Sequence, residues 1–182
     1  MPYLVQGAAL APTTTSLLSS THLRRLIVAF VAIALAITMI AIEAPIATQA
    51  YSASDADRVV SYAQRHVGAR FRIGSTGMRY FDCSGLVYRV YQQAGLVRKI
   101  GGTRKRAATY YKWFRQRGLA SRSNPRVGDL IWWSKNGRIV HTGIYVGGNR
   151  AISALINPWG VSRHGVNLSI RLVAYGHTRL SQ

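Results

Sequence analysis

The chain has 182 residues, of which 48% are hydrophobic, so it is long enough for one domain with a buried core and too apolar to be a disordered polyion. It carries 24 Lys and Arg against 5 Asp and Glu, a net charge of +19 that favours polyanionic partners. Its single cysteine excludes an intramolecular disulfide.

The first 50 residues have the pattern of an export signal. A basic flank, THLRR at 21–25, precedes the apolar run LIVAFVAIALAITMIAI at 26–42, and small residues follow at Thr48 and Ala50. We expect residues 1–50 to be a signal peptide cleaved near Ala50 or a retained membrane anchor, because the run is long for a signal and short for a spanning helix. In either case the rest of the chain is expected outside the cytoplasm, secreted or at the cell wall.

Export changes the expected partner. Removal of residues 1–50 takes away only two arginines and one glutamate, so the remaining chain stays strongly basic. Nucleic acid is then not expected, and an anionic cell-wall polymer or phospholipid surface is the better candidate, with a solvated basic surface as the alternative. The densest basic and aromatic stretch, GTRKRAATYYKWFRQR at 102–117, is the expected contact face, unless it is a helix with a solvated basic side.

Helices are expected first. Ser54 and Asp57 predict a capping box for a helix that ends at Gly68 and whose apolar stripe consists of Val59, Val60, Ala63 and Val67. A second helix is expected to begin near Cys83, where apolar residues recur at helical spacing. A third is expected over about 103–117.

A strand-rich pattern follows. DLIWW at 129–133 predicts a short buried strand, the Asn136-Gly137 pair predicts a hairpin turn, and IVHTGIYV at 139–146 predicts a β-branched strand. RAISAL at 150–155 predicts another strand, and VNLSIRLVAY at 166–175 predicts one or two more. Helices followed by an antiparallel meander predict a single α+β domain over 51–182, with the helices packed on one face of the sheet.

Cys83 lies at the first turn of the second expected helix, in RYFDCSGLVYRVYQQAGL at 79–96. Backbone N–H groups are unpaired there and the helix dipole is positive, so the pKa of the thiol is expected to be lowered in favour of a nucleophilic thiolate. Gly85 is expected to allow a substrate to approach the backbone closely. The alternative is a structural cysteine with no chemical role.

A cysteine nucleophile needs a base, and histidine is the usual one. Among the five histidines, His22 lies in the export segment, His66 in the first expected helix and His177 near the C-terminus. His141 lies inside an expected strand, where strict alternation places it on the same face as Ile139, Gly143 and Tyr145. The alternative reading of His141 is a core histidine with satisfied hydrogen bonds.

Three motifs in order, FDCSGLV, PRVGDLIWW and HTGIYVGG, resemble the NlpC-type family of bacterial cell-wall peptidases, which are papain-like cysteine endopeptidases. The resemblance covers about residues 55–175. It implies a papain-like α+β fold and cleavage of peptidoglycan stem peptides, typically at the amide between D-γ-glutamate and a diamino acid. It also implies that Cys83 is the nucleophile and His141 the base, and that Asp82 and Ser84 help to form the substrate subsite.

Two positions depart from the family pattern. The family usually has a third polar residue, often histidine, twelve positions after the base, and Ser153 stands there in this chain. Its role would be to orient the imidazole, with His164 as an alternative partner unless His164 is an exposed loop residue. Phe71 stands where the family often has a tyrosine that helps the oxyanion site, and the loss of one oxyanion donor typically costs about a hundredfold in rate.

The sequence therefore predicts a secreted, monomeric peptidoglycan endopeptidase in which Cys83 attacks the amide and His141 transfers the proton. No metal or cofactor is expected, because there is no second cysteine and no cluster of His and acidic residues at ligand spacing. The main alternative is a catalytically weak or inactive wall-binding module on the same fold. An amidase or acyltransferase, or a polyanion-binding protein without an active site, are the remaining candidates.

Overall fold

The computed structural model describes residues 53–182, so the expectation for residues 1–50 lies outside the described residues. The helices are α2 (Asp55–Arg65), α3 (Cys83–Gln93) and α4 (Ala107–Gln116), with a short 3-10 turn at Val97–Ile100. The strands are β1 (Arg70–Phe71), β2 (Tyr80–Phe81), β3 (Ala120–Ser121), β4 (Leu130–Lys135), β5 (Arg138–Tyr145), β6 (Arg150–Leu155), β7 (Gly160–Gly165) and β8 (Arg171–Gly176). Within this part of the chain, no helix has the length and hydropathy needed to cross a membrane.

The first helix begins as the sequence predicts. The Ser54 hydroxyl oxygen accepts a hydrogen bond from the Asp57 N–H at 3.0 Å, and the Asp57 carboxylate accepts from the Ser54 N–H, so the capping box is confirmed. Val67 was expected on the apolar stripe of α2 but is 47% exposed. The helix ends at Arg65, so Val67 falls beyond the helical geometry that would have turned it inward.

The third helix begins later than the sequence predicts. It starts at Ala107 rather than near Thr103, and the side chain of its N-cap residue, Arg106, forms no hydrogen bond with the first turn. Tyr110 and Phe114 are fully buried, as the helical spacing predicts. The stretch before it, from the 3-10 turn to Arg106, is a loop whose last three residues line a cleft.

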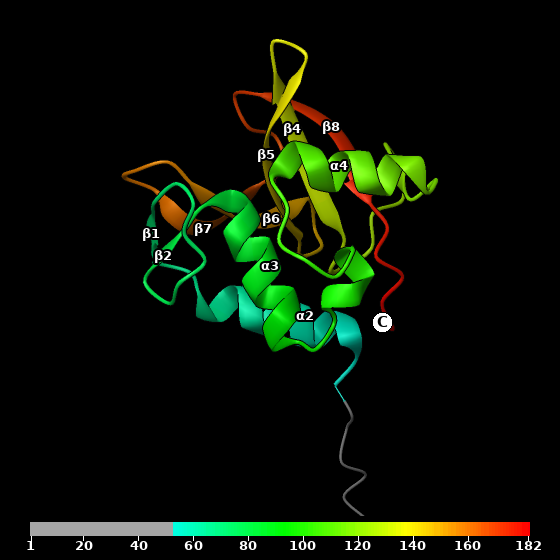
Figure 1. Cartoon of the computed structure of the whole chain (residues 1–182), viewed down its shortest axis with the longest axis horizontal. Coiled ribbons are helices and arrows are strands. Elements are labelled where there is room, and N and C mark those ends of the chain that lie inside the picture. The colour runs from blue at the N-terminus through cyan, green and yellow to red at the C-terminus, as the bar shows by residue number, and fades with distance from the viewer. Residues whose placement is uncertain (1–52) are drawn as a thin grey trace, which may run out of the picture. The chain divides into compact units, whose positions relative to one another are not determined.

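Six strands form one antiparallel sheet in the order β3-β8-β4-β5-β6-β7. β4, β5 and β6 form the expected start of the meander, and β7, for which no strand was expected, extends it. The predicted turn at Asn136 and Gly137 joins β4 to β5, the hairpin that protrudes at the top of Figure 1. β8 does not continue the meander but returns to pair with β4 on its other side. The helices precede the sheet in the chain, and α3 and α4 pack against its strand β5, so the predicted α+β class is confirmed.

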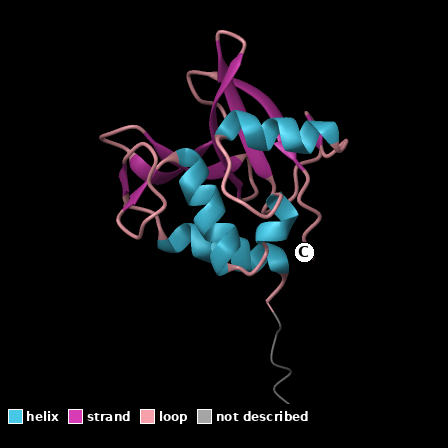
Figure 2. Ribbon diagram, in the orientation of Figure 1, coloured by secondary structure: helices cyan, strands magenta, loops and turns pink. Residues whose placement is uncertain are grey.

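The adjacent tryptophans of β4 occupy two different cores. Trp132 packs in the main core with Phe114 of α4, whereas Trp133 packs in a second cluster with Tyr145 and Val166. This division follows from the alternation of side chains along a strand. Each core therefore covers one face of the sheet, and α3 and α4 lie on the face of the main core (Figure 2).

The alternation expected for β5 is interrupted. The pairing of β4 with β5 shifts between Trp133 and Ser134, so that Trp133 lies opposite His141 while Ser134 lies opposite Ile139. Ile139 consequently packs against the main core, and the expectation that it shares a face with His141 was wrong. Val140 is the extra residue at this bulge and is 48% exposed.

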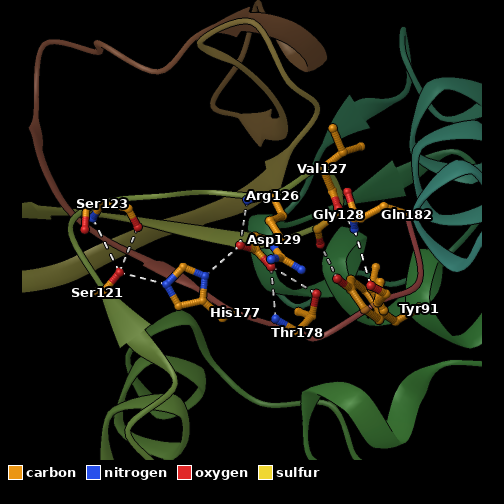
Figure 3. Close-up of polar contacts among 11 residues, drawn as sticks. Tyr91, Ser121, Ser123, Arg126, Val127, Gly128, Asp129, His177, Thr178 and Gln182 are labelled. Carbon is orange, nitrogen blue, oxygen red and sulfur yellow. Dashed lines mark hydrogen bonds and ion pairs between the residues drawn. The ribbon is translucent and has the colours of Figure 1, made fainter.

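A buried carboxylate fixes the segment that leads into β4 (Figure 3). Asp129, which is 1% exposed, accepts hydrogen bonds from the Thr178 N–H at 3.0 Å and from the Arg126 N–H at 3.0 Å. The oxygen that accepts from Arg126, Oδ2, also lies 2.9 Å from Nδ1 of His177. Nε2 of His177 in turn lies 2.7 Å from the hydroxyl of Ser121. The network ties the chain after β8 to the start of β4, the strand that supports β5.

Candidate active site

The site begins at the N-terminus of α3, where Cys83 is the first helical residue and Asp82 is the N-cap. The Asp82 carboxylate accepts four hydrogen bonds: from the Gly85 N–H at 2.6 Å, the Gly74 N–H at 2.7 Å, the Ser84 hydroxyl at 2.9 Å and the Arg104 guanidinium at 2.6 Å. Burial opposes ionisation of Asp82, but these bonds outweigh it and hold its pKa below the usual value. The carboxylate thus joins three segments around the cysteine.

Glycine is required at position 85 by the close packing of α3 against the loop before β2. A Cβ atom at this position would lie 2.0 Å from the carbonyl oxygen of Ser75, so only glycine allows α3 to approach the loop before β2. The expectation that Gly85 makes room for a substrate was therefore wrong. The close approach also lets the Asp82 N–H donate to the Ser75 carbonyl at 3.1 Å.

The thiol of Cys83 differs from the expectation in its acidity. Burial is the largest effect and, with the negative charge of Asp82, it raises the pKa of Cys83 to about 11. The backbone N–H groups of Thr142, Ser84 and Cys83 act in the expected direction and lower the pKa, but they do not offset the loss of solvation. The prediction of a lowered thiol pKa was wrong, because the sequence shows the helix N-terminus but not how deeply it is buried.

His141 lies next in sequence to Thr142, the β5 residue whose backbone contacts the sulfur of Cys83. Its side chain is only 8% exposed, and its Nε2 lies 2.8 Å from the hydroxyl of Ser153. Burial, and then the proximity of His164, lower the pKa of His141 to about 4. At neutral pH the structure therefore places a neutral imidazole and a neutral thiol at the junction of β5 and α3.

Ser153, the departure from the family pattern, is fully buried on β6. It reaches His141 because β5 and β6 approach closely at Gly143, where a Cβ atom would lie 2.8 Å from Cβ of Ser153. The same hydroxyl lies 2.7 Å from Nε2 of His164. His164 is not an exposed loop residue but a half-buried residue of β7, so both candidates for the third position belong to one cluster.

A cleft of about 760 Å³ opens at Cys83. Its wall includes the predicted residues Phe71, Asp82 and Ser84, but not His141 or Ser153, which are buried. The rest of the lining comes from the loop before α4, the first turn of α4 and the bulged start of β5: Arg104, Lys105, Arg106, Ala107, Ala108, Ile139 and Val140. Residues 104–108 belong to the basic and aromatic stretch expected to contact an anionic surface, but nothing in the sequence placed them beside Cys83.

The cleft is electropositive. Three consecutive cations line it and Asp82 is its one acid. Arg104 is paired with Asp82, and Lys105 donates to the carbonyl oxygens of Gly101 and Thr103. The cleft therefore favours a substrate that carries carboxylates. Among the described residues, no group of three His, Cys, Asp or Glu side chains could hold a metal ion.

Comparison with known proteins gives a consistent assignment. The model of the NlpC/P60 family matches residues 68–171. The chain is 31% identical over 130 residues to the probable endopeptidase p60 of Listeria grayi, covering 71% of this chain and 24% of that protein. It is 33% identical over 87 residues to the murein DD-endopeptidase MepS/murein LD-carboxypeptidase of Escherichia coli, covering 48% of this chain and 43% of that protein.

A solved structure agrees in fold. The NlpC/p60 domain of the peptidoglycan hydrolase SagA superposes with a TM-score of 0.53 at 25% identity, covering 66% of this chain and 97% of that one. The match of the family model extends over more than half of the chain and contains Cys83, His141, Ser153 and His164. Although it spans only about a quarter of the length of its Listeria relative, this chain belongs to the NlpC/P60 family.

Proposed function

We propose that this protein is a cysteine peptidase that hydrolyses amide bonds in the stem peptides of peptidoglycan. The observation that carries the proposal is the position of Cys83, at the start of a helix, at the opening of a cleft and against the backbone next to His141. The related proteins named as endopeptidases and as a peptidoglycan hydrolase support the same substrate class. The cations of the cleft suit a peptide that carries several carboxylates.

The proposed reaction is acyl transfer in two steps. His141 takes the proton of the Cys83 thiol as the sulfur attacks the amide carbonyl, and the imidazolium then protonates the leaving amine, which leaves a thioester. Water, deprotonated by His141, hydrolyses the thioester and restores the thiol. Because Cys83 and His141 are both neutral at rest, the thiolate forms during attack rather than before it.

The N-terminus of α3 would stabilise the oxyanion. The N–H groups of Cys83 and Ser84 in the first helical turn are directed at the sulfur and are suited to a developing negative charge, whereas the Gly85 N–H already donates to Asp82. Phe71 lines the cleft and offers no hydroxyl to assist, so these backbone groups carry this task with one donor fewer. Asp82 and Ser84 also line the cleft, where we propose that they border the substrate.

The bond we propose is the amide between D-γ-glutamate and the diamino acid. The test uses two defined soluble peptides, one with this bond and one with the D-alanyl cross-link, each incubated with the purified protein and with its Cys83→Ala variant. We expect the wild type to cleave the γ-glutamyl bond and the variant to cleave neither. Cleavage of the cross-link alone would assign a different bond to the same site.

The alternative function is a wall-binding module with little or no catalysis. The observation that favours it is the pair of departures at Phe71 and Ser153, which lie at the oxyanion site and beside the base. If this alternative holds, both peptides remain intact while the wild type and Cys83→Ala still sediment equally with purified peptidoglycan.

A further inference from the structure

A chain of short hydrogen bonds runs from the proposed base across three strands. Nε2 of His141 lies 2.8 Å from Oγ of Ser153, and that oxygen lies 2.7 Å from Nε2 of His164. Nδ1 of His164 lies 2.8 Å from the carbonyl oxygen of Gly165. Three side chains, from β5, β6 and β7, are thus connected in series and end on a backbone carbonyl.

The sheet register accounts for this alignment. Ser153 pairs with Ser162, so His164, two residues further along β7, is its diagonal neighbour on the same face. The indole of Trp133 covers the cluster, with ring centroids 5.2 Å from His141 and 5.8 Å from His164. The bond between His141 and Ser153 is therefore buried, and the bond between Ser153 and His164 is partly buried. Away from water a hydrogen bond is stronger, and a missing bond is more costly.

The carbonyl at the end of the chain determines the direction of every bond. A carbonyl oxygen only accepts, so Nδ1 of His164 must carry a proton and donate it to Gly165. A neutral His164 then has an unprotonated Nε2, which accepts the hydroxyl proton of Ser153. The oxygen of Ser153 in turn accepts from Nε2–H of His141. This leaves Nδ1 of His141 without a proton, as the role of base that we propose for His141 requires.

Protonation of His164 would reverse the direction. Both nitrogens of the imidazolium would donate, so Ser153 would accept from His164 and turn its hydroxyl proton toward Nε2 of His141. The proton of neutral His141 would then reside on Nδ1, and the base would be lost. Burial lowers the pKa of His164, which keeps it in the neutral form that the site requires.

We propose that His164 is a positioning residue that acts through Ser153 and fixes the tautomer of His141. Ser153 alone could rotate its hydroxyl and either donate to His141 or accept from it, because an uncharged hydroxyl is both a donor and an acceptor. The acceptor nitrogen of His164 removes that freedom and makes the serine oxygen a stronger acceptor for the imidazolium that forms during attack. The inference rests on the proposed hydrolysis by Cys83 and His141.

The test compares His164→Gln, which keeps an acceptor oxygen for the Ser153 hydroxyl, with His164→Leu, which does not. Rates are measured on a soluble stem peptide, with Ser153→Ala, the double variant Ser153→Ala/His164→Leu, and His66→Gln as a control for a buried histidine outside the site. We expect His164→Leu to lower kcat by about 10- to 100-fold with little change in KM, and His164→Gln to restore part of it. The double variant should be no slower than Ser153→Ala, since both residues act through one chain.

A spectroscopic measurement makes the test independent of turnover. Nitrogen-15 NMR of the histidine rings should show the His141 proton on Nε2 in the wild type, and a mixture of tautomers in Ser153→Ala and His164→Leu. Equal rates for His164→Leu and wild type, additive losses in the double variant, or the His141 proton on Nδ1 in the wild type would each overturn the role of His164. Activity that survives Cys83→Ala would instead contradict the proposed function, so the two failures are distinguishable.

Discussion

At the scale of single residues, the site combines a weak acid with a weak base. Burial raises the pKa of Cys83 to about 11 and lowers the pKa of His141 to about 4, so neither group is charged near neutral pH. A preformed thiolate–imidazolium pair would need the pKa of Cys83 to lie below that of His141. The attack must therefore be assisted by transfer of the proton to His141 during the reaction, and this makes the tautomer of His141 decisive.

This state of the thiol can be measured directly. We expect no thiolate absorbance near 240 nm between pH 6 and 8 in a difference spectrum of wild type minus Cys83→Ala, because Cys83 is the only cysteine. Alkylation by iodoacetamide should be slow at neutral pH and should rise as the pH approaches 11. A thiolate band already present at pH 6 would show an ion pair and contradict the neutral resting state.

The same burial predicts how stability depends on pH. The pKa of His141 is about 4 in the folded chain against an ordinary 6.5, and that of His164 is lowered as well, so the unfolded chain binds more protons in this range. The free energy of unfolding should therefore fall as the pH drops from about 6.5 to about 4. Asp82 adds its loss only at lower pH, because its pKa is below 3.8.

Urea denaturation at several pH values checks this expectation, with His141→Gln as the comparison. The variant should show a shallower decline, since it has lost the more strongly shifted histidine. A wild-type unfolding free energy that is constant between pH 7 and 4.5 would mean that the imidazoles are solvated, contrary to the structure.

At the scale of elements, the N-terminus of α3 depends on the contact at Gly85. We expect Gly85→Ala to lower the free energy of unfolding by about 1–3 kcal/mol, because its Cβ would lie 2.0 Å from the Ser75 carbonyl and the helix must move. Movement of α3 also displaces Cys83, so activity should fall. The control is Gly77→Ala in the same loop, where the nearest atom would be 3.9 Å away. Equal melting temperatures for the two variants would contradict this account.

Local signals predicted the elements that local chemistry determines. The capping box at Ser54 and the turn at Asn136 and Gly137 were both confirmed, because each depends on bonds within a few residues. β7 was missed, since GVSRHG at 160–165 has neither a β-branched run nor strict alternation and is held by its pairing with β6. The return of β8 to β4 was also missed, because partner choice depends on distant segments.

The site was likewise predicted where local patterns determine it and missed where the assembled fold does. Cys83 and His141 were chosen from a helix start and a strand pattern, and the family spacing added Ser153. The role of His164 could not be decided from the sequence, because its contact with Ser153 depends on the register between β6 and β7. The acidity of the thiol was predicted in the wrong direction, since burial is a property of the assembled fold.

At the scale of the whole molecule, charge is very unevenly balanced. The described residues contain four acids, and each is engaged: Asp55 with Arg58, Asp57 in the capping box, Asp82 with Arg104, and Asp129 with His177. Nearly all of the Lys and Arg side chains therefore have no acid partner within this part of the chain. A polyanionic surface, such as an anionic cell-wall polymer, would neutralise them.

If charge directs wall binding, salt should weaken it. We expect the fraction of Cys83→Ala protein that sediments with purified cell walls to fall steeply between low salt and about 1 M, where the screening length is about 3 Å. The inactive variant prevents digestion of the wall during the measurement. Binding that is unchanged over this range would show that contacts other than charge hold the protein to the wall.

The most direct test of the proposed peptidase activity is digestion of purified peptidoglycan by the wild type and by Cys83→Ala in parallel, with mass spectrometry of the released fragments. The wild type should release soluble fragments cut between D-γ-glutamate and the diamino acid, and the variant should release none. Fragments released equally by both proteins, or by neither while both remain bound to the wall, would contradict the proposed activity.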